Sequence, residues 1–261
     1  MIGAWVVAAT LAAQSAPPLS GNVTLVGDYR FRGVSQTYGQ PAIQGGVEYA
    51  SAAGAYAGSW ASNVSGNQFL NGGSLELDVY GGYRWRAFDV GVQYYWYPRA
   101  RYNIDPGDRY NTTEVYVATR YKQVTGKYSY ALTNLFGMKT RTIGGYCGLA
   151  GDGTAATSDC LGTGRSQGSG YVDLAATFPV IEGVNLGLHY GYQHVRHYSR
   201  LSYSDYRVAL TRQFGAITLG AAAVGTDAER RFYRFAPTTA GSQETEDVAK
   251  LAIVLSATKT F

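Results

Sequence analysis

The feature that most constrains this chain is an alternation of apolar and polar residues that recurs about a dozen times along it. It is clearest near the end, where Leu251, Ile253 and Leu255 alternate with smaller or polar residues and Phe261 comes last. Alternation with period 2 over about ten residues is typical of a β-strand whose two faces meet different surroundings. Repeated along a whole chain, with aromatic residues near the strand ends, it is typical of a transmembrane β-barrel.

The composition suits strands with one face in lipid and the other in water. Of the 261 residues, 34 are glycine and 23 are tyrosine, and charged residues make up 15%, below the roughly 25% of soluble domains. After the N-terminal segment there is no run of about 18 apolar residues, which excludes a helical membrane protein. A soluble β-sandwich also alternates, but its edge strands would break the outward pattern of Leu, Val and Tyr found here.

We therefore predict an all-β fold: a single transmembrane antiparallel β-barrel of about twelve strands. The connections alternate strictly between short and long, which matches the short periplasmic turns and long extracellular loops of outer-membrane barrels. The short ones are residues 51–54, 85–87, 123–126, 179–183 and the turn at Gly215; the long ones are 32–41, 64–73, 98–112, 137–170, 195–204 and 227–249. The predicted strands are residues 22–31, 42–50, 55–63, 74–84, 88–97, 113–122, 127–136, 171–178, 184–194, 205–214, 217–226 and 250–261.

Charged residues indicate which face of each strand points outward. In residues 74–84, Val79 shares one face with other apolar residues, whereas Glu76 and Asp78 share the opposite face. A slip of one residue would move both carboxylates into lipid, where a charge at the midplane costs roughly 2–4 kcal/mol. Aromatic residues at the strand ends are expected to form two girdles at headgroup depth. The outer girdle is predicted at Tyr29, Phe31, Tyr94, Trp96, Tyr190 and Tyr192, and the inner one at Tyr83, Phe88, Tyr121, Phe178, Phe214 and Phe261.

The N-terminal segment and the two cysteines indicate export. Residues 1–16 are apolar and then turn small and polar, like a secretory signal peptide. They lack a basic residue, since none precedes Arg30, which is consistent with a truncated start. The barrel domain is then expected over residues 17–261. Cys147 and Cys160 lie in one polar, Gly-rich loop, where a disulfide is favoured over a metal site because two thiols without a nearby histidine leave zinc short of ligands. No metal or cofactor is expected.

Several segments in the first 100 residues are similar to a known family. They are residues 28–36 (DYRFRGVSQ), 41–46 (PAIQGG), 56–64 (YAGSWASNV) and 74–80 (SLELDVY). Together they resemble the TorF-type family of outer-membrane porins of Gram-negative bacteria. The resemblance implies an outer-membrane β-barrel that forms a pore. It implies no particular substrate and no functional residues.

The alternation also predicts a lumen lined with charge. One interpretation is a narrow, charged path for the passive diffusion of ions or small polar solutes. The alternative is a plugged barrel in which the inward charges pair with one another. Carboxylates outnumber arginines on the inward faces, which favours a mild preference for cations. The predicted pore-lining residues are Asp28, Arg30, Glu48, Glu76, Asp78, Asp89, Glu114, Arg120, Asp173, Asp205 and Arg207, with Arg32 and Arg84 also facing inward.

Two further function classes stay open. His197 and Ser199 are two residues apart, as in some outer-membrane lipid hydrolases, but the chemistry also needs a group that orients the histidine. None stands at a clear spacing, so no catalytic residue is expected. A non-conducting structural or adhesive barrel would need only its loops.

The partners expected from the sequence follow from the outer loops and the chain end. Basic residues gather in the long loops, where lipopolysaccharide or an acidic solute would meet them. Phe261 resembles the C-terminal signal that the barrel assembly machinery reads. The net charge of +4 is too small to indicate nucleic acid as a partner.

Overall fold

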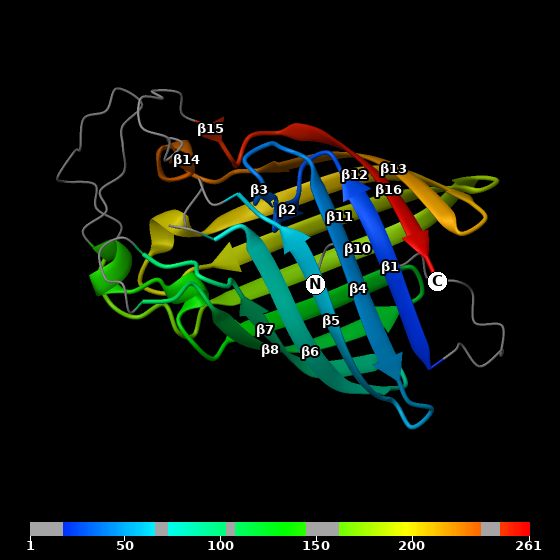
Figure 1. The fold of residues 1–261 in the computed structure, drawn as a ribbon, viewed down its shortest axis with the longest axis horizontal. Coiled ribbons are helices and arrows are strands. Elements are labelled where there is room, and N and C mark those ends of the chain that lie inside the picture. The colour runs from blue at the N-terminus through cyan, green and yellow to red at the C-terminus, as the bar shows by residue number, and fades with distance from the viewer. Residues whose placement is uncertain (1–17, 66–72, 103–107, 145–161, 236–245) are drawn as a thin grey trace.

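The computed structural model describes residues 18–65, 73–102, 108–144, 162–235 and 246–261. Within them, twelve antiparallel strands close into a barrel because the first strand pairs with the last as well as with its neighbour (Figure 1). The prediction of a twelve-stranded barrel is confirmed. The strands are β1 (Leu19–Val26), β4 (Ala42–Ala50), β5 (Ala55–Asn63), β6 (Leu75–Trp85), β7 (Phe88–Trp96), β8 (Thr112–Tyr121), β9 (Val124–Ala131), β10 (Gly170–Ile181), β11 (Val184–His194), β12 (Tyr203–Phe214), β13 (Ile217–Thr226) and β16 (Ala252–Thr260).

The two ends of the barrel differ. Tight hairpin turns join β4 to β5, β6 to β7, β8 to β9, β10 to β11 and β12 to β13 at one end, where the C-terminus also lies. The described parts of the longer connections are at the other end (Figure 1). The predicted alternation of short and long connections is therefore present in the structure. Strands β4, β5, β11 and β13 begin and end at the predicted residues.

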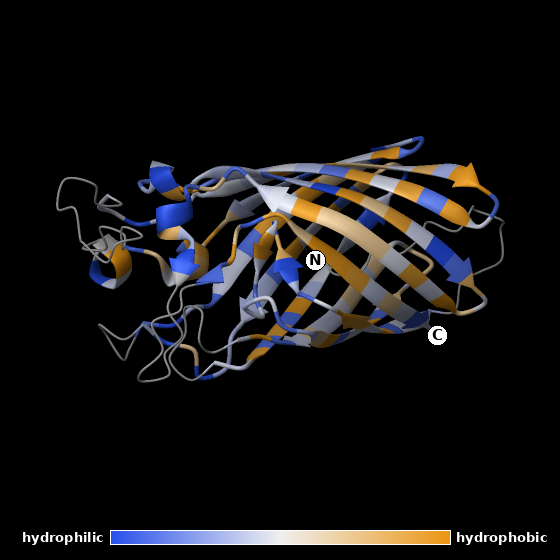
Figure 2. Ribbon diagram, turned by 90° about the horizontal axis from the view of Figure 1, so that it is seen from above, coloured by the Kyte–Doolittle hydropathy of each residue, from blue (hydrophilic) through white to orange (hydrophobic). Residues whose placement is uncertain are grey.

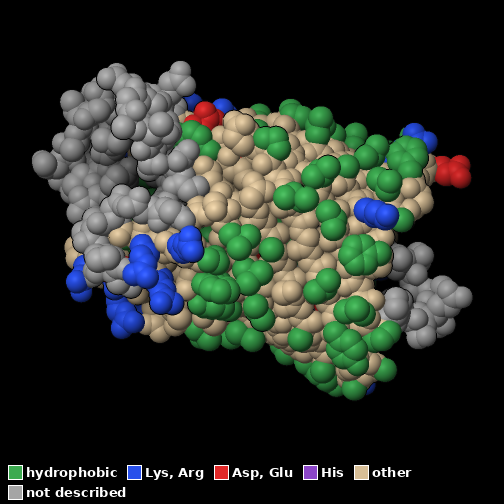
Figure 3. All heavy atoms as spheres, in the orientation of Figure 1, with side chains coloured by type: hydrophobic (Ala, Val, Ile, Leu, Met, Phe, Trp, Pro, Cys, Tyr) green, Lys and Arg blue, Asp and Glu red, His purple; other side chains and the backbone are tan. Residues whose placement is uncertain are grey.

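The faces of the strands follow the predicted alternation. Leu251 and Ile253 are 62% and 72% exposed on the outside, whereas Val254 is 8% exposed. On β6, Val79 is 51% exposed and its inward neighbours Glu76 and Asp78 are buried. Figure 2 shows the resulting alternation of hydropathy along the strands. On the outer surface, apolar side chains are spread from one end of the barrel to the other (Figure 3).

Smaller elements lie in the long connections. β2 (Arg30–Phe31) pairs with β3 (Val34–Ser35), and β14 (Arg234–Phe235) pairs with β15 (Glu246–Asp247). Four short helices, η1 (Leu135–Gly137), η2 (Thr140–Gly144), η3 (Ser199–Leu201) and η4 (Arg230–Phe232), complete the described elements. None of these helices has the length and hydropathy that a membrane span requires.

Two strands end five residues earlier than predicted. β1 stops at Val26 and β9 at Ala131, so residues 27–31 and 132–136 leave the barrel wall. The prediction that Tyr29 and Phe31 belong to the outer aromatic girdle is wrong, since they are only 4% and 6% exposed. Their rings turn inward because they pack against Trp60, Tyr95 and Phe136, which are distant in the sequence. The alternation of a single strand carries no information about such contacts. The other residues predicted for the two girdles are exposed on the outer surface.

Two predictions fall outside the described residues: the signal-peptide-like segment 1–16, and the disulfide between Cys147 and Cys160.

Candidate functional site: a hairpin folded into the barrel

A short hairpin between β1 and β4 folds into the lumen. β2 and β3 are joined by Arg32 and Gly33, whose φ angles of 48° and 80° are both positive. A two-residue turn of this kind is typical of type I′, which favours Asn-Gly. A Cβ at Gly33 would lie 2.5 Å from Thr226 Cγ2 and 2.7 Å from Asp205 Cβ. The tip of the hairpin therefore lies directly against the inner faces of β12 and β13.

Arg32 fixes this tip to two other parts of the wall. Its Nη2 donates to Glu114 Oε2 of β8 at 2.7 Å, and its Nη1 donates to Gln193 Oε1 of β11 at 2.5 Å. The guanidinium also lies 4.2 Å from the centre of the Tyr171 ring. Burial alone lowers the pKa of the Arg32 guanidinium, but the Glu114 carboxylate outweighs it and holds that pKa above its usual value. A bulky residue in the left-handed region costs about 1–2 kcal/mol, and these contacts offset that cost.

The base of the hairpin is held by Asp28. Its carboxylate accepts hydrogen bonds from Arg30 Nε at 2.7 Å, Ser35 Oγ at 2.5 Å and Thr37 Oγ1 at 3.1 Å. Arg30 also donates to the Lys250 carbonyl oxygen at 2.6 Å, which ties the hairpin to the start of β16. Asp28 and Arg30, predicted to line the pore from a strand, therefore organise the hairpin instead.

Aromatic rings fill the space between the hairpin and the opposite wall. Phe31 packs against Tyr95 and Phe136 with ring centroids 5.5 and 5.6 Å apart. Tyr29 packs against Trp60 of β5 at 5.3 Å. All of these rings except Phe136 are at most 6% exposed. The long-loop half of the lumen is therefore closed by the hairpin and by side chains that surround it.

Below the tip, a histidine lies between two aspartates. His189 Nε2 of β11 is 2.8 Å from Asp205 Oδ1, and its Nδ1 is 3.3 Å from Asp173 Oδ1. Tyr171, whose ring lies beside Arg32, donates to Asp205 Oδ2 at 2.8 Å. The wall beneath the hairpin is thus a connected set of polar groups, which couples the position of Arg32 to β10, β11 and β12.

A second ionic group lies nearer the short-turn end. Arg84 binds Glu48 through both carboxylate oxygens, at 2.6 and 3.0 Å, and reaches Asp89 at 3.4 Å. Tyr56 donates to Asp89 at 2.5 Å. The Arg84 side chain is 44% exposed and that of Asp89 is 29% exposed, so this half of the lumen is open to water.

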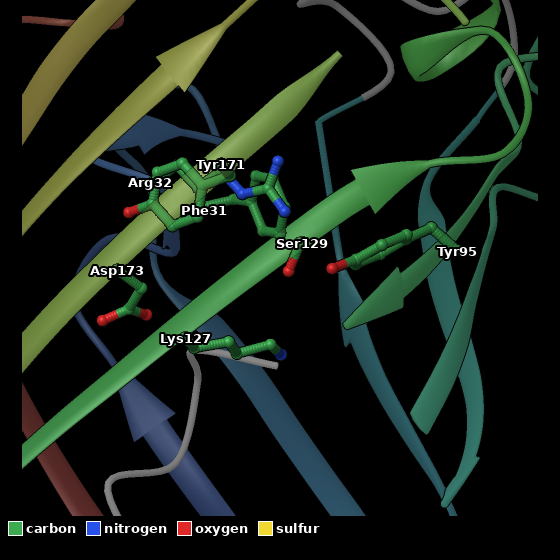
Figure 4. Close-up of a pocket in the computed structure, with 7 residues that line it drawn as sticks. All are labelled: Phe31, Arg32, Tyr95, Lys127, Ser129, Tyr171 and Asp173. Carbon is green, nitrogen blue, oxygen red and sulfur yellow. The ribbon is translucent and has the colours of Figure 1, made fainter. Parts of the chain in front are cut away.

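A small cavity lies between the two halves, and we call it the constriction. Figure 4 shows the residues that surround it: Arg32 lies beside Tyr171, and the Tyr95 hydroxyl points toward Ser129. The space they leave has room for about one water molecule. Lys127 of β9 is half-buried, with its Nζ 3.9 Å from the centre of the Tyr116 ring. The constriction is lined by Phe31, Arg32, Tyr95, Lys127, Ser129, Tyr171 and Asp173.

Most of the other predicted lumen residues face inward, but many are already paired. Gln93 donates to Asp78 at 2.9 Å, and Glu114 is bound by Arg32. Arg120 is exposed at the short-turn end of β8, where its backbone N–H donates to the Ala87 carbonyl oxygen. The predicted inward residues buried or half-buried on the strands are Glu48, Glu76, Asp78, Asp89, Glu114, Asp173, Asp205 and Arg207.

Sequence reasoning missed two features of this site. Arg32 was expected to face inward from the start of the long connection 32–41, but the hairpin tip that it forms with Gly33 was not predicted. The glycine at residue 33 was the available signal for a tight turn. Lys127 has inward alternation on β9 but was not counted among the lumen charges.

His197 and Ser199 gain no support as a catalytic pair. In the described residues, their side chains are not hydrogen-bonded to each other or to a carboxylate. The same part of the chain holds no cluster of three or more potential metal ligands.

Comparisons with known proteins find one matching family model and several solved structures of similar fold. A family model described as "Bacterial protein of unknown function (Gcw_chp)" matches residues 10–261. No curated protein matches the sequence. Among solved structures, the NanC porin is similar with a TM-score of 0.48 and 9% identity, over 92% of this chain and 98% of that one. The KdgM porin in complex with disordered oligogalacturonate has a TM-score of 0.47 and 7% identity, over 93% and 98%. An outer membrane channel from Pseudomonas putida F1 has a TM-score of 0.42 and 12% identity, over 93% and 95%.

Proposed function

This chain belongs to the Gcw_chp family of bacterial proteins of unknown function, so its function has to be inferred from its own structure. We propose that it is an outer-membrane channel. The channel would let ions or small polar solutes diffuse passively through a narrow charged lumen. The observation that carries the proposal is a closed barrel that is apolar outside and ionic inside. The resemblance of its first 100 residues to TorF-type porins supports the same class.

The outer surface supports placement in a membrane. Leu25, Ile43 and Leu210, from three different strands, are 59%, 59% and 52% exposed. Monomeric soluble proteins rarely expose contiguous apolar patches above a few hundred Å², and here such residues surround the barrel. A closed barrel also satisfies every strand edge internally, which a bilayer requires. The tight turns would then face the periplasm and the long loops the exterior.

The lumen supports a path for polar solutes. On the short-turn side, Glu48, Asp89 and Arg84 are partly exposed on inward faces, so water can reach them. From there the lumen narrows to the constriction at Arg32 and Lys127. Passage beyond it requires the hairpin to shift from the wall. In this proposal Arg32 and Lys127 set the charge at the narrowest point, and the hairpin sets its width.

The buried hairpin also favours one alternative, a non-conducting barrel. Both proposals place the protein in the outer membrane, and they differ in whether the hairpin ever leaves its site. A lipid hydrolase has no comparable support, because within the described ranges the side chains of His197 and Ser199 form no hydrogen bond with each other or with a carboxylate.

Single-channel recording in a planar bilayer tests the proposal. We would compare the full chain with a variant in which residues 28–40 are replaced by a short Gly-Ser turn. The full chain should give small or intermittent conductance steps, and the replacement should give larger and steadier ones because the constriction is gone. Both proteins should first show the heat-modifiable migration of a folded barrel. A folded replacement variant that carries no current would contradict the channel and favour the non-conducting barrel.

A further inference from the structure

Basic residues gather on one side of the long-loop end of the barrel. Arg101 pairs with Arg109 within the connection that follows β7, and Lys139 pairs with Arg165 within the connection that follows β9, each through an isolated backbone bridge. Lys139 forms a salt bridge with Asp108, which links the two connections. Figure 3 shows Lys and Arg side chains gathered at this end, next to the apolar outer surface. This basic rim patch consists of Arg99, Arg101, Arg109, Lys139, Arg141 and Arg165.

Three of the six residues in the basic rim patch have no carboxylate partner in the part of the chain that the structure describes. Asp108 binds Lys139, but Arg99, Arg109 and Arg165 are exposed and form no salt bridge with a carboxylate in the described residues. Arg99 has a φ of 65° in the turn closed by the Ala100 N–H and the Tyr97 carbonyl oxygen, 3.1 Å apart. Glycine or asparagine is favoured at such a position, so the turn geometry does not explain an arginine there.

The patch begins where the apolar outer surface ends. Trp96, 40% exposed, closes β7 and precedes Arg99 by three residues. Leu132, 42% exposed, follows β9 and precedes the segment that carries Lys139. Aromatic residues at strand ends lie at headgroup depth in membrane barrels. The guanidinium groups of the patch would therefore stand in the headgroup layer of the outer leaflet.

We propose that the basic rim patch binds the phosphate groups of a glycolipid in the outer leaflet, a lipid A type molecule. The inference rests on the proposed placement in the outer membrane. The planar guanidinium matches phosphate oxygens with two parallel hydrogen bonds, and exposed arginines from two connections can hold two phosphates at once. The continuity of the patch with the apolar outer surface favours a lipid over a free acidic solute, because the acyl chains have a surface to lie on.

Binding in detergent micelles tests this inference. The variant replaces Arg99, Arg109 and Arg165 with glutamine, and the probes are lipid A with two phosphates and the same lipid without phosphates. Native mass spectrometry of the intact barrel should show binding of the phosphorylated lipid weakened on the order of 100-fold by the three substitutions. Binding of the dephosphorylated lipid should be weak and equal for the two proteins.

A matched control removes the same charge from the opposite rim. Arg86, Lys122 and Arg212 lie 4.5, 5.4 and 4.9 Å from the ring centres of Trp85, Tyr121 and Phe214 at the short-turn end. Their replacement with glutamine should leave binding of the phosphorylated lipid unchanged. Equal loss in both triple variants would show a general charge effect and overturn the site.

Two further measurements distinguish a specific lipid site from a general anion-binding surface and from a failure of the membrane placement. If inorganic phosphate at millimolar concentration displaces the lipid completely, the patch is a general anion surface and the inference fails. Fractionation of cells tests the membrane placement separately. A protein that is found in the outer membrane and conducts, but binds both lipids equally, leaves the proposed function intact and removes only the lipid site.

Discussion

Arg32 and Glu114 form a buried salt bridge of 2.7 Å although 82 residues separate them along the chain. Their side chains are 3% and 4% exposed, so neither charge is solvated by water. One partner belongs to the inward hairpin and the other to the wall of β8. This pair therefore holds the hairpin in the lumen, and its loss should affect both the hairpin and the wall at β8.

Replacing Arg32 with alanine should release the hairpin. Removing one partner of a buried ion pair costs about 3–5 kcal/mol, and withdrawal of the hairpin avoids much of that cost because water then reaches Glu114. A reporter cysteine in place of Val34, which is 4% exposed, should react with a maleimide much faster in this background, and the conductance should rise. Arg84→Ala is the control, since Arg84 pairs with the wall and not with the hairpin. Unchanged reactivity of the reporter would contradict the role of Arg32.

Gly33→Ala should displace the hairpin tip by a different route. A Cβ there would lie 2.7 Å from Asp205 Cβ, and this clash adds to the left-handed φ of 80°. Gly215→Ala provides the comparison, because Gly215 has a φ of 60° but nothing within 4 Å of its added Cβ. It should lose only about 1–2 kcal/mol of backbone energy. The midpoint of urea unfolding should fall more for Gly33→Ala, and equal midpoints would show that the tip does not contact the wall.

Lys127→Glu should shift the ion selectivity of the proposed channel toward cations. The side chain lines the constriction, where fixed charge dominates the local field, whereas exposed charges are screened beyond about 8–10 Å. The reversal potential in a salt gradient measures the shift. Lys122→Glu makes the same charge change at the exposed turn beyond β8, so its reversal potential should match that of the unaltered chain. A shift of the same size in both variants would place the selective step outside the constriction.

Deleting Phe261 should lower the amount of barrel inserted into the outer membrane. The backbone of Phe261 exchanges hydrogen bonds of 2.9 and 3.0 Å with Gly21, and a Cβ at Gly21 would lie 2.6 Å from the Phe261 ring. The last residue thus closes the contact between β1 and β16. Phe214→Ala is the control, since it removes an exposed ring at the same rim away from that contact. Equal levels of heat-modifiable barrel in the deletion variant and the unaltered chain would refute the prediction.

The barrel wall could be predicted from the sequence because its signal is local. Period-2 alternation places Val79 outward and Glu76 inward whatever the rest of the chain does, and turn lengths give the order of the ends. The course of residues 27–31 could not be predicted in the same way. Tyr29 and Phe31 alternate like strand residues, and what turns them inward is packing against Trp60, Tyr95 and Phe136.

The position of Arg32 illustrates the same limit for the site. Its hydrogen-bond acceptors, Glu114 and Gln193, are 82 and 161 residues away. A count of lumen charges treats Arg32 and Glu114 as independent, although in the folded barrel they neutralise each other. The alternation thus finds which residues face the lumen but not which of them remain available to a passing ion.

The pairing of β1 with β16 sets the order in which this protein can be completed. The hairpin is among the first barrel segments to be synthesised, but the strand that encloses it on one side is the last. Before β16 pairs with β1, the edge of β1 is open and the wall beside the hairpin is incomplete. Closure of the wall and enclosure of the hairpin are therefore one event, and in the proposed channel the narrow part of the lumen should form as the barrel closes.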